Sequence, residues 1–386
     1  MTTRFGPRAL LREKAADLLF APGRLPRDRA AAPSTDAPAG RVYAQVVALL
    51  VLVSFRPLAS DVLYSAAAYG VRWTPEDLRW IRVCEFVLGG WVFFWLSALV
   101  IARTTLDQVS CRRRLMVRGA AVLCGAVSMY AAGLVPCRRT AITVFGCTVA
   151  WLAWEVCRAH GVCPAGWFPA TARDRLRDWR IATAVSLVCI AAGGLSKLLT
   201  GLLTDIDGVP VMRGSQWDVL GIHDVGTIGL AAITAVAVED FVMVAGTAAL
   251  LTAIRRPAWE IYTLICLAEV LAHAYMGLPA IAMALYAAGR VWLYRRYQRL
   301  LPLMAVHAGI DLSAASVQVL VPGVYRVVPA LLIALVVLWT GRRLQAGAAV
   351  EERADRYVKQ GPAPARHGEA AVGTPHIQDR PRAPAP

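Results

Sequence analysis

Long, uninterrupted apolar runs recur along this chain, and they constrain its fold more than any other feature. A run of about 20 apolar residues matches the thickness of the hydrocarbon core of a bilayer. The 386 residues are 57% hydrophobic and only 17% charged, whereas soluble domains are about 25% charged. We therefore predict an all-α, polytopic membrane protein with about ten transmembrane helices, rather than a soluble enzyme or a barrel of alternating strands. The expected helices are 42–67, 81–102, 116–135, 140–157, 181–203, 225–254, 257–276, 279–294, 301–321 and 325–341.

The first of these helices is interrupted by polar residues. Arg56, Pro57 and Asp61 all fall inside 42–67. Proline removes a backbone donor and kinks a helix that contains it. We expect this segment either to kink at Pro57 or to be a broken element whose apolar part is 46–55.

The net charge of +15 comes from arginines in the tails and in alternate loops. Basic residues gather in the cytoplasmic loops of membrane proteins, and this bias explains the charge without a nucleic-acid partner. The alternation predicts a multi-pass protein of the cell membrane, in contact with bilayer lipid and with both termini in the cytoplasm. Residues 1–41 form a basic tail. Residues 342–386 lack the hydrophobicity needed to fold and are expected to be disordered.

Ionisable residues inside three apolar runs are the main functional signal. Such groups are costly in a bilayer, so they face the interior of the helix bundle and are functional candidates by default. Residues four apart share one face of a helix, and the three runs can therefore converge on one site. The groups are the doublet Glu239 and Asp240, the pair Glu269 and His273, and the pair His307 and Asp311.

The residue types alone leave several interpretations open. A buried histidine can simply hydrogen-bond to a neighbouring helix, and buried acids also form proton paths in transporters. A divalent metal site is a third interpretation, because oxygen and nitrogen ligands suit zinc, manganese or iron. Its ligands would be Glu269, His273, His307 and Asp311, with Glu239 as a fifth group.

The nine cysteines do not indicate a disulfide framework. Most lie inside the expected spans, where a free cysteine behaves as a small apolar residue. Cys157, His160 and Cys163 form a C-x2-H-x2-C pattern in a loop. Zinc sites need four ligands, and no clear fourth ligand lies nearby, so we assign no metal there.

The order of the ionisable motifs resembles the CAAX-protease and bacteriocin-processing (CPBP) family of intramembrane proteases. That family shows E-E-x-x-x-R, then F-x-x-x-H, then H-x-x-x-N or H-x-x-x-D. Glu239 and Asp240 stand at the first motif, His273 ends the second, and His307 and Asp311 match the third. The run GRVWLYRRYQRLLPLMAVHAGIDL also looks like the approach to the third motif of the family.

Three positions depart from the family pattern. Asp240 replaces the second Glu, Glu269 replaces the Phe, and Val244 stands where the Arg would be. Because that Arg would balance the second acid, Asp240 needs another cation. The candidates at membrane depth are Arg56 and Arg290.

The resemblance implies a bacterial intramembrane endopeptidase that cleaves membrane-associated, prenylated or leader-type peptides and needs no metal cofactor. A CPBP-like scaffold or bacteriocin-immunity protein without catalysis is the first alternative, and a proton-coupled transporter is the second. The implied catalytic groups are Glu239 as general base, His273 on the water, and His307 and Asp311 at the oxyanion, with Asp240 and Glu269 supporting them.

The resemblance also divides the chain. Residues 223–341 would form the CPBP-like core, and residues 42–222 would add transmembrane helices of unknown role. If their helices start at the same cytoplasmic face, His273 lies about 24 Å along its helix and His307 about 9 Å along its own. The two imidazoles can then meet only if the segment 279–294 is short or re-entrant, which we expect.

Overall fold

A computed structural model of the chain shows helices joined by turns and loops in the residues that it describes. The described residues are 39–68, 72–104, 111–131, 138–164, 171–206, 208–212, 216–222, 224–320, 335–336, 339–347, 349–350 and 353. Within them the one pairing of extended backbone is an isolated antiparallel bridge between Val211 and Gly277. The expected all-α class is confirmed. The elements are α2 (Ala39–Ala68), α3 (Pro75–Thr104), α4 (Cys111–Ala131), α5 (Arg138–Ala159), α6 (Ala172–Leu203), α7 (Gln216–Val219), α8 (Val225–Ala235), η2 (Val236–Gly246), α9 (Thr247–Ala253), α10 (Ala258–Ala272), η3 (Ala274–Met276), η4 (Leu278–Ala282), α11 (Met283–Tyr297) and α12 (Leu301–Leu320).

Four helical stretches in the described chain are long and apolar enough to cross a membrane. Three shorter apolar helices accompany them, at Ala39–Ser54, Leu115–Ala131 and Leu301–Val317. Most of the expected helix 325–341 lies outside the described residues. The four long stretches are Pro75–Ala102, Arg138–Ala159, Asp174–Leu203 and Val225–Ala253, the last made of α8, η2 and α9 in succession.

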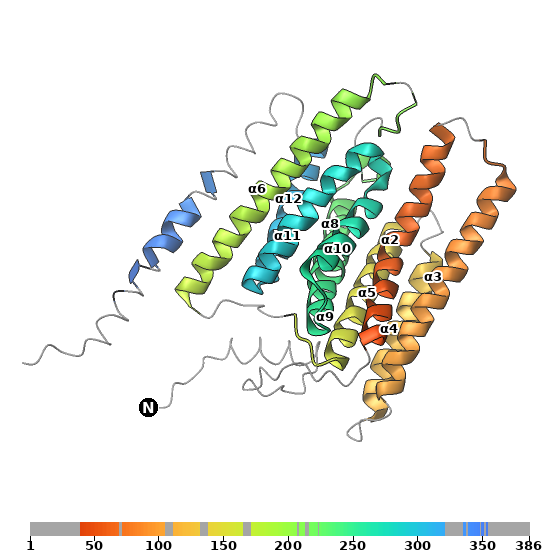
Figure 1. Ribbon diagram of the computed structural model, residues 1–386, viewed down its shortest axis with the longest axis horizontal. Coiled ribbons are helices and arrows are strands. Elements are labelled where there is room, and N and C mark those ends of the chain that lie inside the picture. The colour runs from red at the N-terminus through yellow and green to blue at the C-terminus, as the bar shows by residue number, and fades with distance from the viewer. Residues whose placement is uncertain are drawn as a thin grey trace, which may run out of the picture.

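The long helices lie side by side along one common direction, with α6 at one side of the bundle and α3 and α4 at the other (Figure 1). Large apolar side chains are exposed on the outer helices, and Trp80, Trp91 and Phe94 on α3 are each about half exposed or more. In a soluble protein such a surface would be a liability. On a membrane helix it is the surface that meets lipid.

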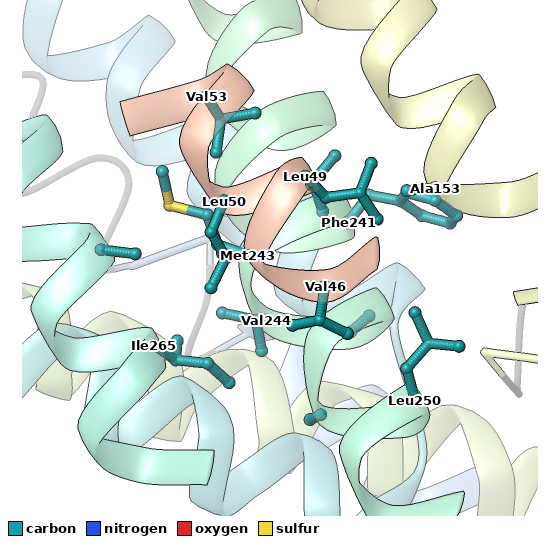
Figure 2. Close-up of a cluster of buried hydrophobic side chains, with 14 of the residues drawn as sticks. Val46, Leu49, Leu50, Val53, Ala153, Phe241, Met243, Val244, Leu250 and Ile265 are labelled. Carbon is teal, nitrogen blue, oxygen red and sulfur yellow. The ribbon is translucent and has the colours of Figure 1, made fainter. Parts of the chain in front are cut away.

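The helix α2 lies inside the bundle, not at its edge. Val46, Leu49 and Leu50 of α2 pack against η2 and α10 in one apolar cluster (Figure 2). Ser54 also donates a hydrogen bond to the Ala268 carbonyl oxygen in α10, at 3.4 Å. The apolar core therefore crosses the 222/223 boundary expected from the sequence.

The same helix runs without interruption through Arg56 and Pro57 to Ala68. The expected broken element is therefore not found. The side chains of residues 55–68 lie outside the described part of the chain, and so does the choice of Arg56 as a partner for Asp240.

The chain turns sharply between α10 and α11. Two short 3₁₀ turns, η3 and η4, join the helices, and Gly277 between them has φ +73° and ψ −144°. Leu278 donates its backbone N–H to the Pro210 oxygen at 3.0 Å, and Met212 donates to the Met276 oxygen at 3.1 Å. The segment before α7 therefore holds this turn in place.

The helix α11 has 15 residues, or roughly 22 Å at 1.5 Å per residue. A full crossing needs about 30 Å. The helix α11 alone is thus shorter than a full crossing, but η4 precedes it in the segment 279–294. The expectation that this segment is short or re-entrant therefore stays a prediction.

Residues that the sequence placed in the C-terminal tail continue a helix through 342–347 and 349–350. Gly341 packs directly on the Trp179 indole of α6, where a Cβ would collide with the ring. This segment therefore lies against the start of α6.

Candidate functional site

The acidic doublet lies on a helix that is wound more widely than an α-helix. Residues Val236–Gly246 form a π-helix, and at its end the N–H of Thr247 reaches back five residues to the Val242 oxygen. Wide turns of this kind are rare and occur frequently at functional sites. A wider turn also narrows the angle between consecutive side chains. Glu239 and Asp240 can therefore face the same group.

Asp240 is fully buried and bonds to two different helices. Its Oδ1 accepts a hydrogen bond from Arg290 Nη1 of α11 at 2.8 Å. Its Oδ2 accepts one from His307 Nδ1 of α12 at 3.0 Å. Both carboxylate oxygens therefore have a cationic or polar donor, as a buried charge requires. Of the two cations that the sequence offered for Asp240, Arg290 is the one whose contact with it the described residues show.

Arg290 joins three carboxylates at one point. Besides Asp240, its Nη2 lies 2.5 Å from Glu269 Oε1 of α10 and its Nη1 lies 3.7 Å from Glu239 Oε2. The guanidinium also stacks over the Tyr286 ring one turn earlier, 3.9 Å from the ring centre. We call Glu239, Asp240, Glu269, Arg290 and His307 the ionic cluster.

Tyr286 closes one side of the ionic cluster. Its ring meets the His307 imidazole edge to face, with the two centres 5.5 Å apart. One aromatic side chain therefore restrains both the guanidinium and the imidazole. Tyr286 precedes Arg290 by four residues, and this spacing was the one signal in the sequence that could have identified Tyr286 as part of the site.

Glu239 is the most accessible member of the ionic cluster. Its side chain is 16% exposed, whereas those of Asp240, Glu269 and Arg290 are fully buried. Its Oε2 lies 3.6 Å from His307 Nε2 and 3.7 Å from Arg290 Nη1. That oxygen is buried and accepts no hydrogen bond from the described residues. A polar atom in this state needs a water or a ligand group as its partner.

His273 stands at the end of α10, where the helix gives way to η3. Its Nδ1 lies 2.9 Å from the Glu269 backbone oxygen. Because a carbonyl only accepts, Nδ1 carries the proton, and Nε2 of the neutral ring is left as an acceptor. Ligating atoms of Glu239, Glu269 and His273 lie within 4.8 Å of one another. In the part of the chain that the structure describes, these three residues form the group that could hold a cation.

Asp311 lies at the outer side of the site. Its side chain is 30% exposed, and its Oδ2 lies 3.5 Å from His307 Nε2. His307 therefore has Asp240 on one nitrogen and both Glu239 and Asp311 near the other.

All six sequence-predicted site residues are thus gathered around Glu239 and His307. The proposed metal ligands are not all equivalent, because His307 and Asp311 lie outside the three-residue group that could hold a cation. Each imidazole approaches the Glu239 carboxylate, as a shared site requires.

Val244 is fully buried in the apolar cluster and lies between Val46 and Ile265 (Figure 2). An arginine at this position would place its charge among aliphatic side chains of α2 and α10. This environment explains in physical terms why the cation of the ionic cluster comes from α11.

The C-x2-H-x2-C segment has a structural role at His160. Its Nε2 lies 2.7 Å from Gln45 Oε1 of α2, and Cys157 is fully buried in the apolar cluster. The pattern therefore ties α5 to α2.

Comparison of the chain with family models, curated proteins and solved structures gave no match.

Proposed function

We propose that this protein is an intramembrane endopeptidase of the CPBP type that hydrolyses membrane-associated, prenylated or leader-type peptides with a glutamate-activated water. The observation that carries the proposal is the position of Glu239 Oε2. It has no hydrogen-bond partner among the described residues and lies 3.6–3.7 Å from His307 Nε2 and Arg290 Nη1. These separations are longer than direct hydrogen bonds, so this oxygen is left to accept a hydrogen bond from a water.

The arrangement supports a division of roles. Glu239 takes a proton from the water, which attacks the peptide carbonyl, and the same carboxyl then delivers a proton to the leaving amine. His307 donates from Nε2 to the oxyanion while Asp240 accepts from Nδ1 and balances the imidazolium. His273 accepts a hydrogen bond from the same water at its Nε2, because its Nδ1 donates to the backbone oxygen of Glu269 in α10.

The energetic cost of the ionic cluster also favours a functional role. A buried ion pair is often no more stabilising than well-packed hydrophobic residues of the same volume. Here five ionisable side chains from η2, α10, α11 and α12 meet at one point. Helix packing alone does not require them.

The membrane arrangement that we propose has about ten transmembrane helices with both termini in the cytoplasm. The start of α6, the end of α9 and the end of α11 all lie at the lower side of the bundle in Figure 1. Each carries two or more arginines, including Arg175, Arg255 and Arg295. Basic residues gathered at one end of a bundle favour that end as cytoplasmic.

The test is cleavage of a peptide set by the purified protein in nanodiscs. The set contains farnesylated C-terminal peptides, leader-type peptides and plain transmembrane peptides. Glu239→Gln should lower the rate by at least about a hundredfold, because the general base is lost. Glu260→Gln is the matched control, since Glu260 lies at the other end of α10 and pairs with Arg256. Absence of cleavage by the wild type across the set would overturn the proposal.

Metal-dependent hydrolysis is the second candidate, favoured by the 4.8 Å grouping of Glu239, Glu269 and His273. Repeating the cleavage assay with a metal chelator distinguishes the metal-dependent mechanism from the metal-free one. If a chelator abolishes cleavage and zinc or manganese restores it, the metal mechanism replaces the metal-free one.

A further inference from the structure

A cavity of about 660 Å³ lies where α6 begins and α11 ends, beside the helix 339–347. Binding pockets for small molecules usually measure about 300–1,000 Å³. Its walls are mainly apolar, with Ile181, Ala184 and Leu293 among them, and two aromatic residues, Trp292 and Tyr297, complete them. The charged residues in the described lining of this cavity are arginines, whereas the ionic cluster holds three carboxylates.

The charged residues of the described lining are both arginines. Arg177 and Arg180 are three residues apart on α6, so they lie on the same side of the helix. The Arg177 side chain is 57% exposed, and its Nη1 lies 4.0 Å from Asp174 Oδ1. Among the residues that the structure describes, no carboxylate forms an ion pair with Arg180.

The acids near these arginines are already engaged. Asp178 accepts two hydrogen bonds from Arg299, at 2.7 and 2.5 Å. Asp174 accepts from the backbone of Thr171 in the capping box that starts α6. Asp178 is thus paired with Arg299, and Asp174 is the acid next to Arg177. Arg180 adds a positive charge at the mouth of the cavity that no described carboxylate pairs.

We propose that this cavity binds an anionic phospholipid. The phosphate would lie between Arg177 and Arg180, since a guanidinium forms paired, charge-assisted hydrogen bonds with phosphate oxygens. An acyl chain would follow the wall of Ile181, Ala184 and Leu293. Basic pockets between membrane helices on the cytoplasmic side bind lipid headgroups of this class. The proposal does not depend on peptidase activity.

The lining favours a lipid over free phosphate. A soluble anion gains nothing from aliphatic walls, whereas an acyl chain gains by covering them. Exposed Trp292 and Tyr297 are also the residue types that gather where hydrocarbon meets headgroups. The arginines thus match the phosphate headgroup of a phospholipid, and the apolar walls match its acyl chain.

The experiment counts lipids that stay bound to the protein. The wild-type protein is placed in nanodiscs made of phosphatidylcholine and phosphatidylglycerol. It is then released from the nanodiscs in the mass spectrometer, and the lipids that stay bound to it are measured by native mass spectrometry. We expect phosphatidylglycerol to be enriched over its share of the nanodisc lipid. The double variant Arg177→Gln/Arg180→Gln should lose the enrichment, with each arginine contributing about fivefold in affinity.

The control is Arg175→Gln, which removes one positive charge from the same part of α6 without altering the cavity lining, as each of the two single substitutions would do within it. It should retain phosphatidylglycerol as the wild type does. If this control loses as much phosphatidylglycerol as the double variant, the effect is one of general surface charge and the proposal is overturned. A wild type that shows no enrichment of phosphatidylglycerol would also overturn it.

A second variant tests the apolar half of the site. Ala184→Trp places a bulky ring on the apolar wall along which the acyl chain would lie and leaves both arginines in place, and it should also lose the retained lipid. Excess inorganic phosphate should not displace the lipid from the wild type. Displacement by phosphate, or full retention in Ala184→Trp, would show that the cavity is not a phospholipid site. Monodisperse elution and unchanged circular dichroism show that each variant is folded.

Discussion

Arg290 Nη1 lies 2.8 Å from Asp240 Oδ1, although the two residues are 50 positions apart and belong to different helices. The contact is fully buried on both sides. It supplies the positive charge that the buried Asp240 carboxylate requires. The ionic cluster is therefore complete without an arginine on the helix that carries the acids.

Replacing Arg290 should destabilise the protein strongly. Arg290→Met leaves Asp240 and Glu269 buried without their cation, and breaking a buried pair from one side costs about 3–5 kcal/mol. Thermal unfolding in detergent measures this loss. Arg296→Met is the control, because Arg296 is exposed on the last turn of the same helix. Equal melting temperatures for the two variants would contradict the role given to Arg290.

An arginine at position 244 should not rescue that variant. Val244 lies among aliphatic side chains of α2 and α10 (Figure 2), and an unpaired charge there is costly. We expect Val244→Arg to lower stability by itself, and the double variant Arg290→Met/Val244→Arg to be no better than Arg290→Met. Recovery of the melting temperature in the double variant would mean that position 244 can reach the acids.

The turn at Gly277 should tolerate no side chain. With φ +73° and ψ −144°, a Cβ would collide with the Pro210 oxygen, and backbone strain of this kind costs about 1–3 kcal/mol. Gly277→Ala should therefore lower the unfolding temperature. Gly194→Ala in α6 has open space around it and should be neutral or slightly stabilising. The reverse order of the two variants would refute this account of the turn.

Asp311 should be less critical than Glu239. Its carboxylate is partly exposed and lies 3.5 Å from His307 Nε2, while Asp240 holds the other nitrogen. Asp311→Asn keeps the shape and adds a permanent donor, so peptidase activity should fall by no more than about tenfold, or 1.4 kcal/mol. A complete loss that excess metal reverses would instead identify Asp311 as a metal ligand.

Reporter tags inserted before Val42 and after Arg343 should both read as cytoplasmic. The prediction follows from the arginines at the start of α6 and the ends of α9 and α11. An external reading after Arg343 would indicate a miscounted span, most simply in the Arg56–Pro57 segment.

The sequence predicted the helical class and the meeting of the acid–histidine groups for the same physical reason. Apolar runs of membrane length must be helical, and ionisable groups within them can only face one another. The spacing of four in the pair His307 and Asp311 was enough to place both on one face of α12.

Other features depend on tertiary contacts and left no signal in the sequence. Nothing in VAVEDFVMVA distinguishes a π-helix from an α-helix, because both bury the same residues. The choice of Arg290 as the partner of Asp240 depended on how α11 packs. That packing is close, since Gly289 lies directly against Val188 of α6.

The separation of Arg290 from Asp240 along the chain has a consequence for synthesis. At roughly 5–20 residues per second, Arg290 emerges from the ribosome several seconds after Asp240. During that interval the helix carrying Glu239 and Asp240 exists without the guanidinium that pairs with them in the folded protein. Its stable burial must wait for α11 and α12. The position of one arginine in the sequence therefore sets when the ionic cluster can form, and not only how it is finally packed.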